Sequence, residues 1–425
     1  MKIMTWYGPW PSAYALMSCA LLSMALAAPT SGQAQESTRA VSHAAAGTHT
    51  LNQALEAAWQ RSLEVSESRG RSARAQADQA VTQSWLAAAP AVSFGQREGR
   101  AGAPAASRET ELGLALPLWR PGQRAAGGQA AQSQSAWVQA TEQAERLRLA
   151  GRLREVMGAL HLAEADLYQL EQQVQDLAQL TQDVERRVRA GDLAPADALA
   201  ARAEWLAAQA QSSAARQALG IQQSHWHLLT GLAPLKLKTS VAPALAQLPD
   251  THPELVLVNA AVDLGQRQVD LARVQRSDSP QLTLGLRQEH PGQGAASQSS
   301  VVVALRVPVG GQVYQQPRIA AAVGELDMAQ TQAQRTRERL RAEVALAQSQ
   351  LGLSQAQLQA EQERAQLLAE RARLIEKSFR AGETALPDML RAMAAAVNAK
   401  SALARQQINH QTAMARLEQA LGLLP

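Results

Sequence analysis

Cysteine is nearly absent from the chain, since Cys19 is the only one among 425 residues. It lies in an apolar N-terminal stretch that we expect to be removed, so the mature protein would have no thiol. That excludes disulfide bonds and thiol catalysis. Cys19 follows Leu16-Met17-Ser18, which faintly resembles a lipoprotein site. Because the apolar run continues beyond it, lipidation is the less favoured alternative.

The motifs of several large enzyme classes are also missing. The sequence contains no H-E-x-x-H zinc motif, no G-x-S-x-G nucleophile elbow and no phosphate-cradling glycine loop. The formal net charge of +4 is small and spread along the chain, without a basic cluster interleaved with aromatic residues. An enzyme is therefore the least favoured class, no cofactor is expected, and nucleic-acid binding has little support.

Histidine does not indicate a metal site. His225 and His227 are close in sequence, but a spacing of two places them on different faces of a helix. The other histidines are scattered, so we predict no metal ligands.

Aromatic residues are few, and Phe94 and Phe379 are the only phenylalanines. Alanine, glutamine, leucine, glutamate and arginine dominate instead, which is typical of long helices. Trp119 and Tyr314 are the other aromatic residues near the predicted strands. Trp119 could anchor the chain at a membrane interface or pack against the start of a long helix, and the sequence does not decide between the two.

The N-terminus has the organisation of a secretory signal peptide. Lys2 precedes an apolar run, which ends in Ala25-Leu26-Ala27, an A-x-A-like cleavage site. The run is short for a membrane anchor, which needs about 20 apolar residues. We predict a signal peptide over 1–27, with cleavage possibly as late as 34, and a flexible segment over 28–50.

The rest of the chain is duplicated with an offset of about 190 residues. Arg189-Ala190-Gly191-Asp192 returns as Arg380-Ala381-Gly382-Glu383, and Asp197 returns as Asp388. Other landmarks obey the same offset: Pro90 and Pro280, Gly95 and Gly285, Leu116-Pro117-Leu118 and Val307-Pro308-Val309, and Gly231-Leu232 and Gly422-Leu423. We predict two tandem repeats, over 51–240 and 241–425.

Each repeat is predicted to contain a helix, a β-hairpin and a long helical pair. The first helix spans about 51–88 and ends before Pro90. Apolar residues at alternate positions predict hairpins over 91–119 and 281–309. No proline interrupts 123–190, and an unbroken helix of that length would extend on the order of 100 Å. Gly191 and Gly382 should end the long helices, and the return helices should begin near Asp192 and Glu383. Four short strands leave edges that oligomerisation would pair.

This duplicated order of elements behind a signal peptide resembles the TolC-like outer-membrane efflux proteins over the whole mature chain. The two R-A-G-[DE] turns and the segment Leu116-Pro117-Leu118-Trp119-Arg120-Pro121-Gly122-Gln123 carry the resemblance. It implies a mainly α fold with a small β part. Three protomers would form a 12-stranded outer-membrane β-barrel on a periplasmic α-helical barrel, in a Gram-negative bacterium.

The segment from Pro117 to Arg124 looks most like the heavy-metal branch typified by cobalt-zinc-cadmium resistance. The resemblance implies a passive duct that receives its cargo from an inner-membrane pump of the resistance-nodulation-division type through a periplasmic adaptor. A duct for organic toxicants or for type I protein secretion is the alternative. A periplasmic coiled-coil scaffold is a remote one, because it would not need four strands.

The resemblance also implies roles for particular residues. The two turns should meet the adaptor at the periplasmic tip, and Asp388 should lie near the periplasmic aperture, with Asp197 as its counterpart. Some relatives carry a second acid where this chain has Arg391. An arginine there would offset a ring of Asp388 carboxylates or form ion pairs between subunits. The eight turn residues are Arg189, Ala190, Gly191, Asp192, Arg380, Ala381, Gly382 and Glu383.

Overall fold

The computed structural model describes residues 50–99, 107–234, 247–275, 278–291, 296–310 and 312–425. All of them belong to one compact unit, Thr48–Pro425. The predicted signal peptide, Cys19 and nearly all of the segment 28–50 lie outside the described residues.

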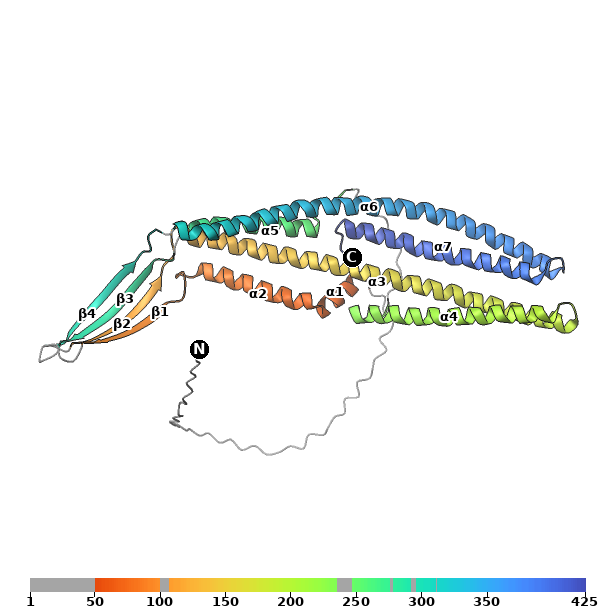
Figure 1. The fold of residues 1–425 in the computed structure, drawn as a ribbon, viewed down its shortest axis with the longest axis horizontal. Helices are drawn as coiled ribbons and strands as arrows, with labels where there is room; N and C mark the ends of the chain where they lie inside the picture. Colours follow the sequence, from red (N-terminus) through yellow and green to blue (C-terminus); the bar gives the residue numbers. More distant parts are fainter. Residues whose placement is uncertain (1–49, 100–106, 235–246, 276–277, 292–295, 311) are drawn as a thin grey trace, which may run out of the picture. The chain divides into compact units, whose positions relative to one another are not determined.

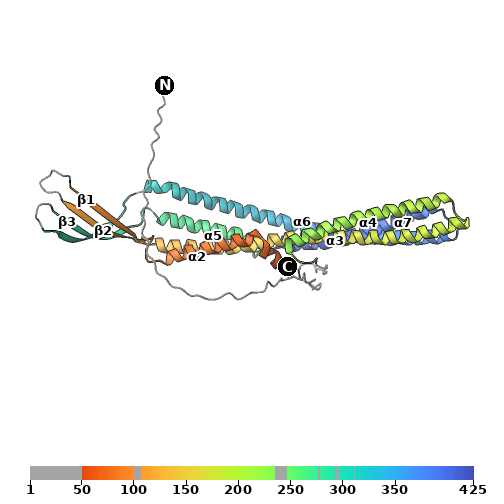
Figure 2. The same cartoon turned by 90° about the horizontal axis from the view of Figure 1, so that it is seen from below.

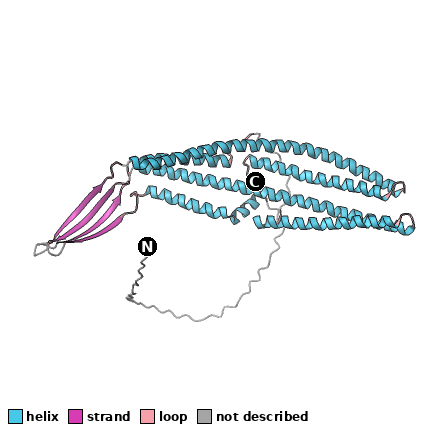
Figure 3. Ribbon diagram, in the orientation of Figure 1, coloured by secondary structure: helices cyan, strands magenta, loops and turns pink. Residues whose placement is uncertain are grey.

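The described part of the chain consists of long helices and a small sheet, in an order that occurs twice (Figures 1 and 3). The first set is α1 (Leu51–Arg61), α2 (Leu63–Gln83), β1 (Ala91–Glu98), β2 (Arg108–Pro117), α3 (Gln123–Ala190) and α4 (Pro195–Thr230). The second set is α5 (Pro253–Val274), β3 (Gln281–His290), β4 (Gln298–Arg306), α6 (Gln312–Arg380) and α7 (Leu386–Ala420).

The four strands form one antiparallel sheet in the order β1-β2-β3-β4. The two predicted hairpins are confirmed, and β2 pairs with β3 to join them. Strands β1 and β4 are the edges, and no other described strand pairs with their outer sides. Each edge therefore exposes a row of backbone donors and acceptors.

One face of the sheet is apolar and exposed. Residues opposite each other in an antiparallel pair share a face, so the register aligns the apolar side chains into rows. Several of these side chains are more than 60% exposed, among them Phe94, Leu286 and Val301. The rows are Val92, Leu114, Leu284 and Val303, then Phe94, Leu112, Leu286 and Val301.

The other face of the sheet is polar and carries an ion-pair network. Arg287 lies 2.7 Å from a carboxylate oxygen of Glu109 and 2.8 Å from one of Glu289. The sheet thus has an apolar side that none of the described helices or strands covers, and a charged side, which is the distribution of a sheet between lipid and water.

The uninterrupted helix predicted over 123–190 is confirmed as α3. Helices α3 and α4 form one antiparallel pair, α6 and α7 the other, and α3 also contacts α7. Figures 1 and 2 show the two pairs running side by side to their turns, while α2 and α5 accompany α3 and α6 toward the sheet. None of the described helices combines the length and apolarity needed to cross a membrane.

The prediction of a single helix over 51–88 is wrong. The chain has two helices there, because Ser62 is extended (φ −80°, ψ 153°) and separates α1 from α2. The break lets Trp59 before it and Val65 after it enter the same core cluster, together with Leu153 of α3 and Trp226 of α4. A continuous helix would not place Trp59 and Val65, six residues apart, on one face.

The predicted starts of the return helices are also three residues too early. Helices α4 and α7 begin at Pro195 and Leu386 rather than at Asp192 and Glu383. The residues between are used by the turn itself, and proline suits the first helical turn because its missing N–H would have no partner there.

Candidate functional site at the paired turns

The two turns have the same backbone conformation. Gly191 and Gly382 are left-handed, with φ of 87° and 80°. The amide of Asp192 donates to the carbonyl of Arg187 at 2.9 Å, and that of Glu383 donates to the carbonyl of Ser378 at 3.0 Å. These are Schellman-type ends, which satisfy carbonyl groups that a helix terminus leaves without a partner.

The predicted turn residues are accessible. All eight of them, from Arg189 to Asp192 and from Arg380 to Glu383, are exposed in the chain. Arg380 forms an ion pair with Glu376, and Arg189 donates to the carbonyl of Glu185. Their side chains thus extend along their own helices, and the glycine backbones remain open.

The acidic residues after the two turns have different contacts. The carboxylate of Asp197 accepts from the backbone amide of Ala194 at 3.3 Å, so it caps α4. The carboxylate of Asp388 accepts instead from the guanidinium of Arg391 at 2.7 Å, one turn later on α7. Both members of that pair are exposed, with 53% and 78% of their side chains accessible.

A contact that the sequence did not predict joins the two helical pairs near the turns. The guanidinium of Arg187 on α3 lies over the ring of Phe379 on α6, 5.0 Å from its centre, and also donates to the carbonyl of Phe379. A carboxylate oxygen of Asp183 lies 3.1 Å from Nε of the same guanidinium. The only sequence feature that could have pointed to it is the rarity of phenylalanine.

Beneath this contact lies a core shared by both pairs. Phe379 is 2% exposed and packs in one cluster with residues of α3, α4 and α7. The two turns therefore end a single packed unit, and the cluster's buried members are Leu177, Leu180, Val184, Ala201, Ala208, Phe379, Leu386 and Met389.

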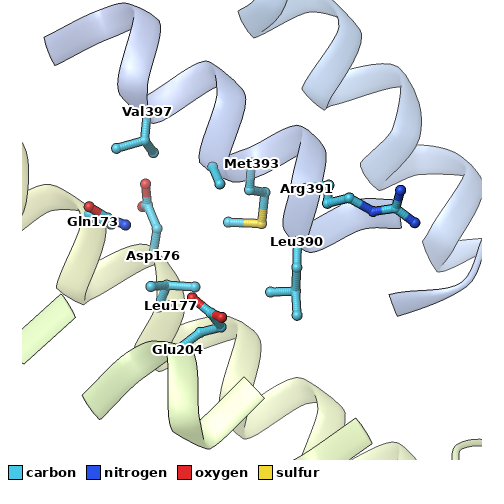
Figure 4. A pocket seen from close by; sticks show the side chains of 9 residues that line it. Gln173, Asp176, Leu177, Glu204, Leu390, Arg391, Met393 and Val397 are labelled. Atoms are coloured by element: carbon cyan, nitrogen blue, oxygen red, sulfur yellow. The ribbon is translucent and has the colours of Figure 1, made fainter. Parts of the chain in front are cut away.

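A groove runs between the two pairs above this core. At its turn side is a pocket of about 150 Å³, in which Asp176 of α3 and Glu204 of α4 lie opposite Met393 of α7 (Figure 4). Arg391 points away from the pocket in this view. Neither carboxylate has a cationic partner among the described residues.

The groove widens farther from the turns into a cavity of about 1050 Å³. Its walls are rich in alanine, and Arg405 of α7 crosses it to Asp166 of α3 at 2.6 Å. This hydrogen bond raises the pKa of Arg405 above its ordinary value, and the charge of Asp166 acts in the same direction. The ion pair is a direct polar link between α3 and α7.

Within the described ranges, no group of three or more His, Cys, Asp or Glu side chains is arranged to hold a metal ion. His225 and His227 are both exposed on α4. The arrangement at the turns offers exposed backbone, a groove and carboxylates.

Known proteins share both the sequence pattern and the fold. The outer membrane efflux protein family model matches residues 244–423, from before α5 to after α7. This is a family of transport channels and not of enzymes. No curated protein matches the chain in sequence.

Solved structures resemble nearly the whole described chain. The outer membrane protein VceC of Vibrio cholerae gives a TM-score of 0.69 at 16% identity, covering 88% of this chain and 96% of VceC. The CmeC outer membrane channel of Campylobacter jejuni gives a TM-score of 0.69 at 16% identity, covering 88% of this chain and 85% of CmeC. CusC gives a TM-score of 0.71 at 16% identity, covering 88% of this chain and 92% of CusC. At such identity the likeness concerns the fold. The chain thus carries the sequence pattern of the outer membrane efflux protein family over 244–423, and nearly its whole described part has the fold of these solved channels.

Proposed function

We propose that the protein is the outer-membrane duct of a tripartite efflux system and works as a homotrimer. It would conduct passively, while an inner-membrane pump of the resistance-nodulation-division type and a periplasmic adaptor supply energy and select the cargo. The observation that carries this proposal is the four-stranded sheet with two open edges and an exposed apolar face. Three copies would close it into twelve strands, which satisfies every backbone group in lipid.

The helices support the same assembly. On the turn side, contacts connect α4 to α3, α3 to α7 and α7 to α6, so α4 and α6 are the outer members. Both carry exposed leucines at multiples of seven residues, the spacing of a coiled-coil seam. In a trimer, α4 of one copy would pack against α6 of the next through Leu199, Leu206, Leu346, Leu353, Leu367 and Leu374, all of which are exposed in the single chain.

The adaptor would bind at the paired turns. The exposed glycine turns and the groove between the helical pairs form a continuous surface, and the carboxylates of Asp176 and Glu204 would attract basic residues on the partner. We assign the eight turn residues, from Arg189 to Asp192 and from Arg380 to Glu383, to this contact.

Asp388 and Arg391 would line the periplasmic aperture. Their 2.7 Å ion pair within one chain supports the interpretation that the arginine offsets the acid, so three Asp388 side chains would create only a weak field. Asp197 caps its helix and would affect gating through the turn instead.

Heavy-metal cations are the proposed cargo, on the likeness of Pro117–Arg124 to the metal branch. The test is the metal tolerance of a deletion strain, scored for cobalt, nickel, zinc, cadmium and copper beside a panel of organic toxicants and secreted proteins. Selective metal sensitivity, restored by the intact gene, is expected. Sensitivity to organic compounds alone would keep the duct and refute the metal cargo, and loss of a secreted protein would indicate type I secretion.

A further inference from the structure

The apolar face of the sheet continues beyond the end of β4. Val307 and Val309 keep the alternation of Val303 and Leu305, and Val309 is 90% exposed. Val313, in the first turn of α6, is 79% exposed. The apolar surface therefore extends from the sheet onto the start of the helix.

Two aromatic side chains are almost fully exposed at the same junction. Tyr314 in the first turn of α6 is 89% exposed, and Trp85 between α2 and β1 is 92% exposed. Figure 1 shows the end of α2 and the start of α6 where the helices meet the sheet. Trp119 differs, because its indole N–H donates to the carbonyl of Ser84 at 3.0 Å and is held against the end of α2.

An arginine beside these residues, Arg318, has no acidic partner in the part of the chain that the structure describes. It follows Tyr314 by four residues, which places the side chains of Tyr314 and Arg318 on one face of α6. By contrast, Arg120 and Arg124 at the same junction donate to backbone carbonyls. Arg306, which ends β4, is opposite Gln281 and belongs to the polar face of the sheet. The first turn of α6 contains no acidic residue.

We propose that Tyr314 and Arg318, with Trp85, form a collar that binds anionic phospholipid headgroups on the periplasmic side of the outer membrane. This inference rests on the proposed function, which places the sheet in the bilayer. Tyrosine and tryptophan are enriched at the level of the headgroups, and guanidinium groups bind phosphate oxygens well.

The chain suits a depth measurement by spin labelling because Cys19 is its only cysteine. In a Cys19→Ser background, single nitroxides would be placed by Val313→Cys, Val303→Cys and Gln355→Cys. Trimers would be reconstituted in vesicles of phosphatidylcholine and phosphatidylglycerol. Collisions with oxygen, which prefers lipid, and with a nickel chelate, which stays in water, then report the depth of each label.

Position 303 should report the bilayer interior, position 355 water, and position 313 an intermediate depth. If the label at position 313 is as accessible to the nickel chelate as the label at position 355, while the label at position 303 lies in lipid, the collar is refuted and the barrel proposal stands. If 303 is also wet, the barrel proposal itself fails. A label at 313 that is immobilised and shielded from both reagents would mean that a neighbouring copy covers the site, which also refutes the collar.

The charge requirement has its own test in the same vesicles. Spin-labelled phosphatidylglycerol should be restricted by the protein severalfold more than spin-labelled phosphatidylcholine. The variant Arg318→Gln should lose this preference, Arg318→Lys should retain most of it, and Arg335→Gln, on an exposed part of α6 farther from the sheet, should leave it unchanged. Equal restriction of the two lipids by the unaltered protein would refute the role of Arg318.

Discussion

Replacing Gly382 by valine tests the backbone requirement of the second turn. The φ of 80° at Gly382 costs a residue with a Cβ about 1–2 kcal/mol. An added Cβ would meet no atom within 4 Å, so the cost arises from the backbone conformation and not from a contact of the Cβ with the rest of the protein. If the backbone relaxes instead, the hydrogen bonds from the amides of Gly382 and Glu383, at 3.1 and 3.0 Å, weaken. Each is worth about 1 kcal/mol.

Either route lowers the stability of the turn by about 1–2 kcal/mol, which is a roughly 5- to 30-fold larger opening constant at 1.4 kcal/mol per factor of ten. Hydrogen exchange of peptides that cover the end of α6 and the start of α7 would measure it in purified trimers. Gly382→Asn is the matched control, because asparagine tolerates the left-handed region. Gly352→Val, in the interior of α6 with open space around it, controls for the side chain.

Faster exchange should be confined to Gly382→Val and to its turn. Equal exchange in the valine and asparagine variants would refute the argument from φ. If the turn opens as expected while efflux and trimer levels stay normal, the backbone reasoning stands, but the proposed adaptor contact at this turn is wrong.

Three further predictions concern side chains. Arg391→Gln should free the carboxylate of Asp388 and raise cation preference, seen as a shifted reversal potential in planar bilayers; an unchanged potential places the pair away from the aperture. Arg187→Gln should remove the contact with Phe379 and increase conductance without adaptor, whereas unchanged conductance would mean that it plays no part in gating. Burial lowers the pKa of His252 from its ordinary value of 6.5. Helix α5 should therefore lose hydrogen-exchange protection as the pH falls below about 6.5. In the variant His252→Asn, which keeps a capping acceptor, α5 should lose less protection over the same pH range.

The direction for His252 follows from which state binds the proton. The buried ring, 2% exposed, favours the neutral form, and its Nδ1 accepts from the amide of Glu254 at 3.1 Å. The open state binds a proton more readily, so stability is retained above the ordinary pKa and lost below it. Burial alone would raise the pKa of Glu254, but hydrogen bonds and charge from Arg339 and Arg148 lower it. Its contribution is therefore lost only in stronger acid.

The sequence predicted those features that depend on local chemistry. The absence of proline between Gly122 and Gly191 predicted the whole of α3, and alternating apolar residues located both hairpins. The break at Ser62 was missed because each side of it has helical periodicity. Only the requirement that Trp59 and Val65 enter one core explains it, and that requirement comes from tertiary packing.

The candidate site shows the same division. The turn glycines could be identified because a left-handed helix end has a local signature. The contact of Arg187 with Phe379 could not, since it joins residues 192 positions apart. The repeats also suggested that Asp197 and Asp388 are equivalent, but one caps a helix and the other pairs with Arg391.

Duplication thus preserved the backbone of the two turns while their side chains diverged. The carboxylate of Asp197 is used by its own helix, and its replacement by asparagine, which still accepts the bond from Ala194, should change little. The carboxylate of Asp388 makes no hydrogen bond to the backbone of its helix. Its charge and the exposed guanidinium of Arg391, with which it pairs, are therefore available to a neighbouring copy. If the aperture is formed by the second turn, then Asp388→Asn should alter ion selectivity and Asp197→Asn should not. Equal effects of the two substitutions on the reversal potential would show that the turns contribute alike and that the divergence of their contacts has no functional consequence.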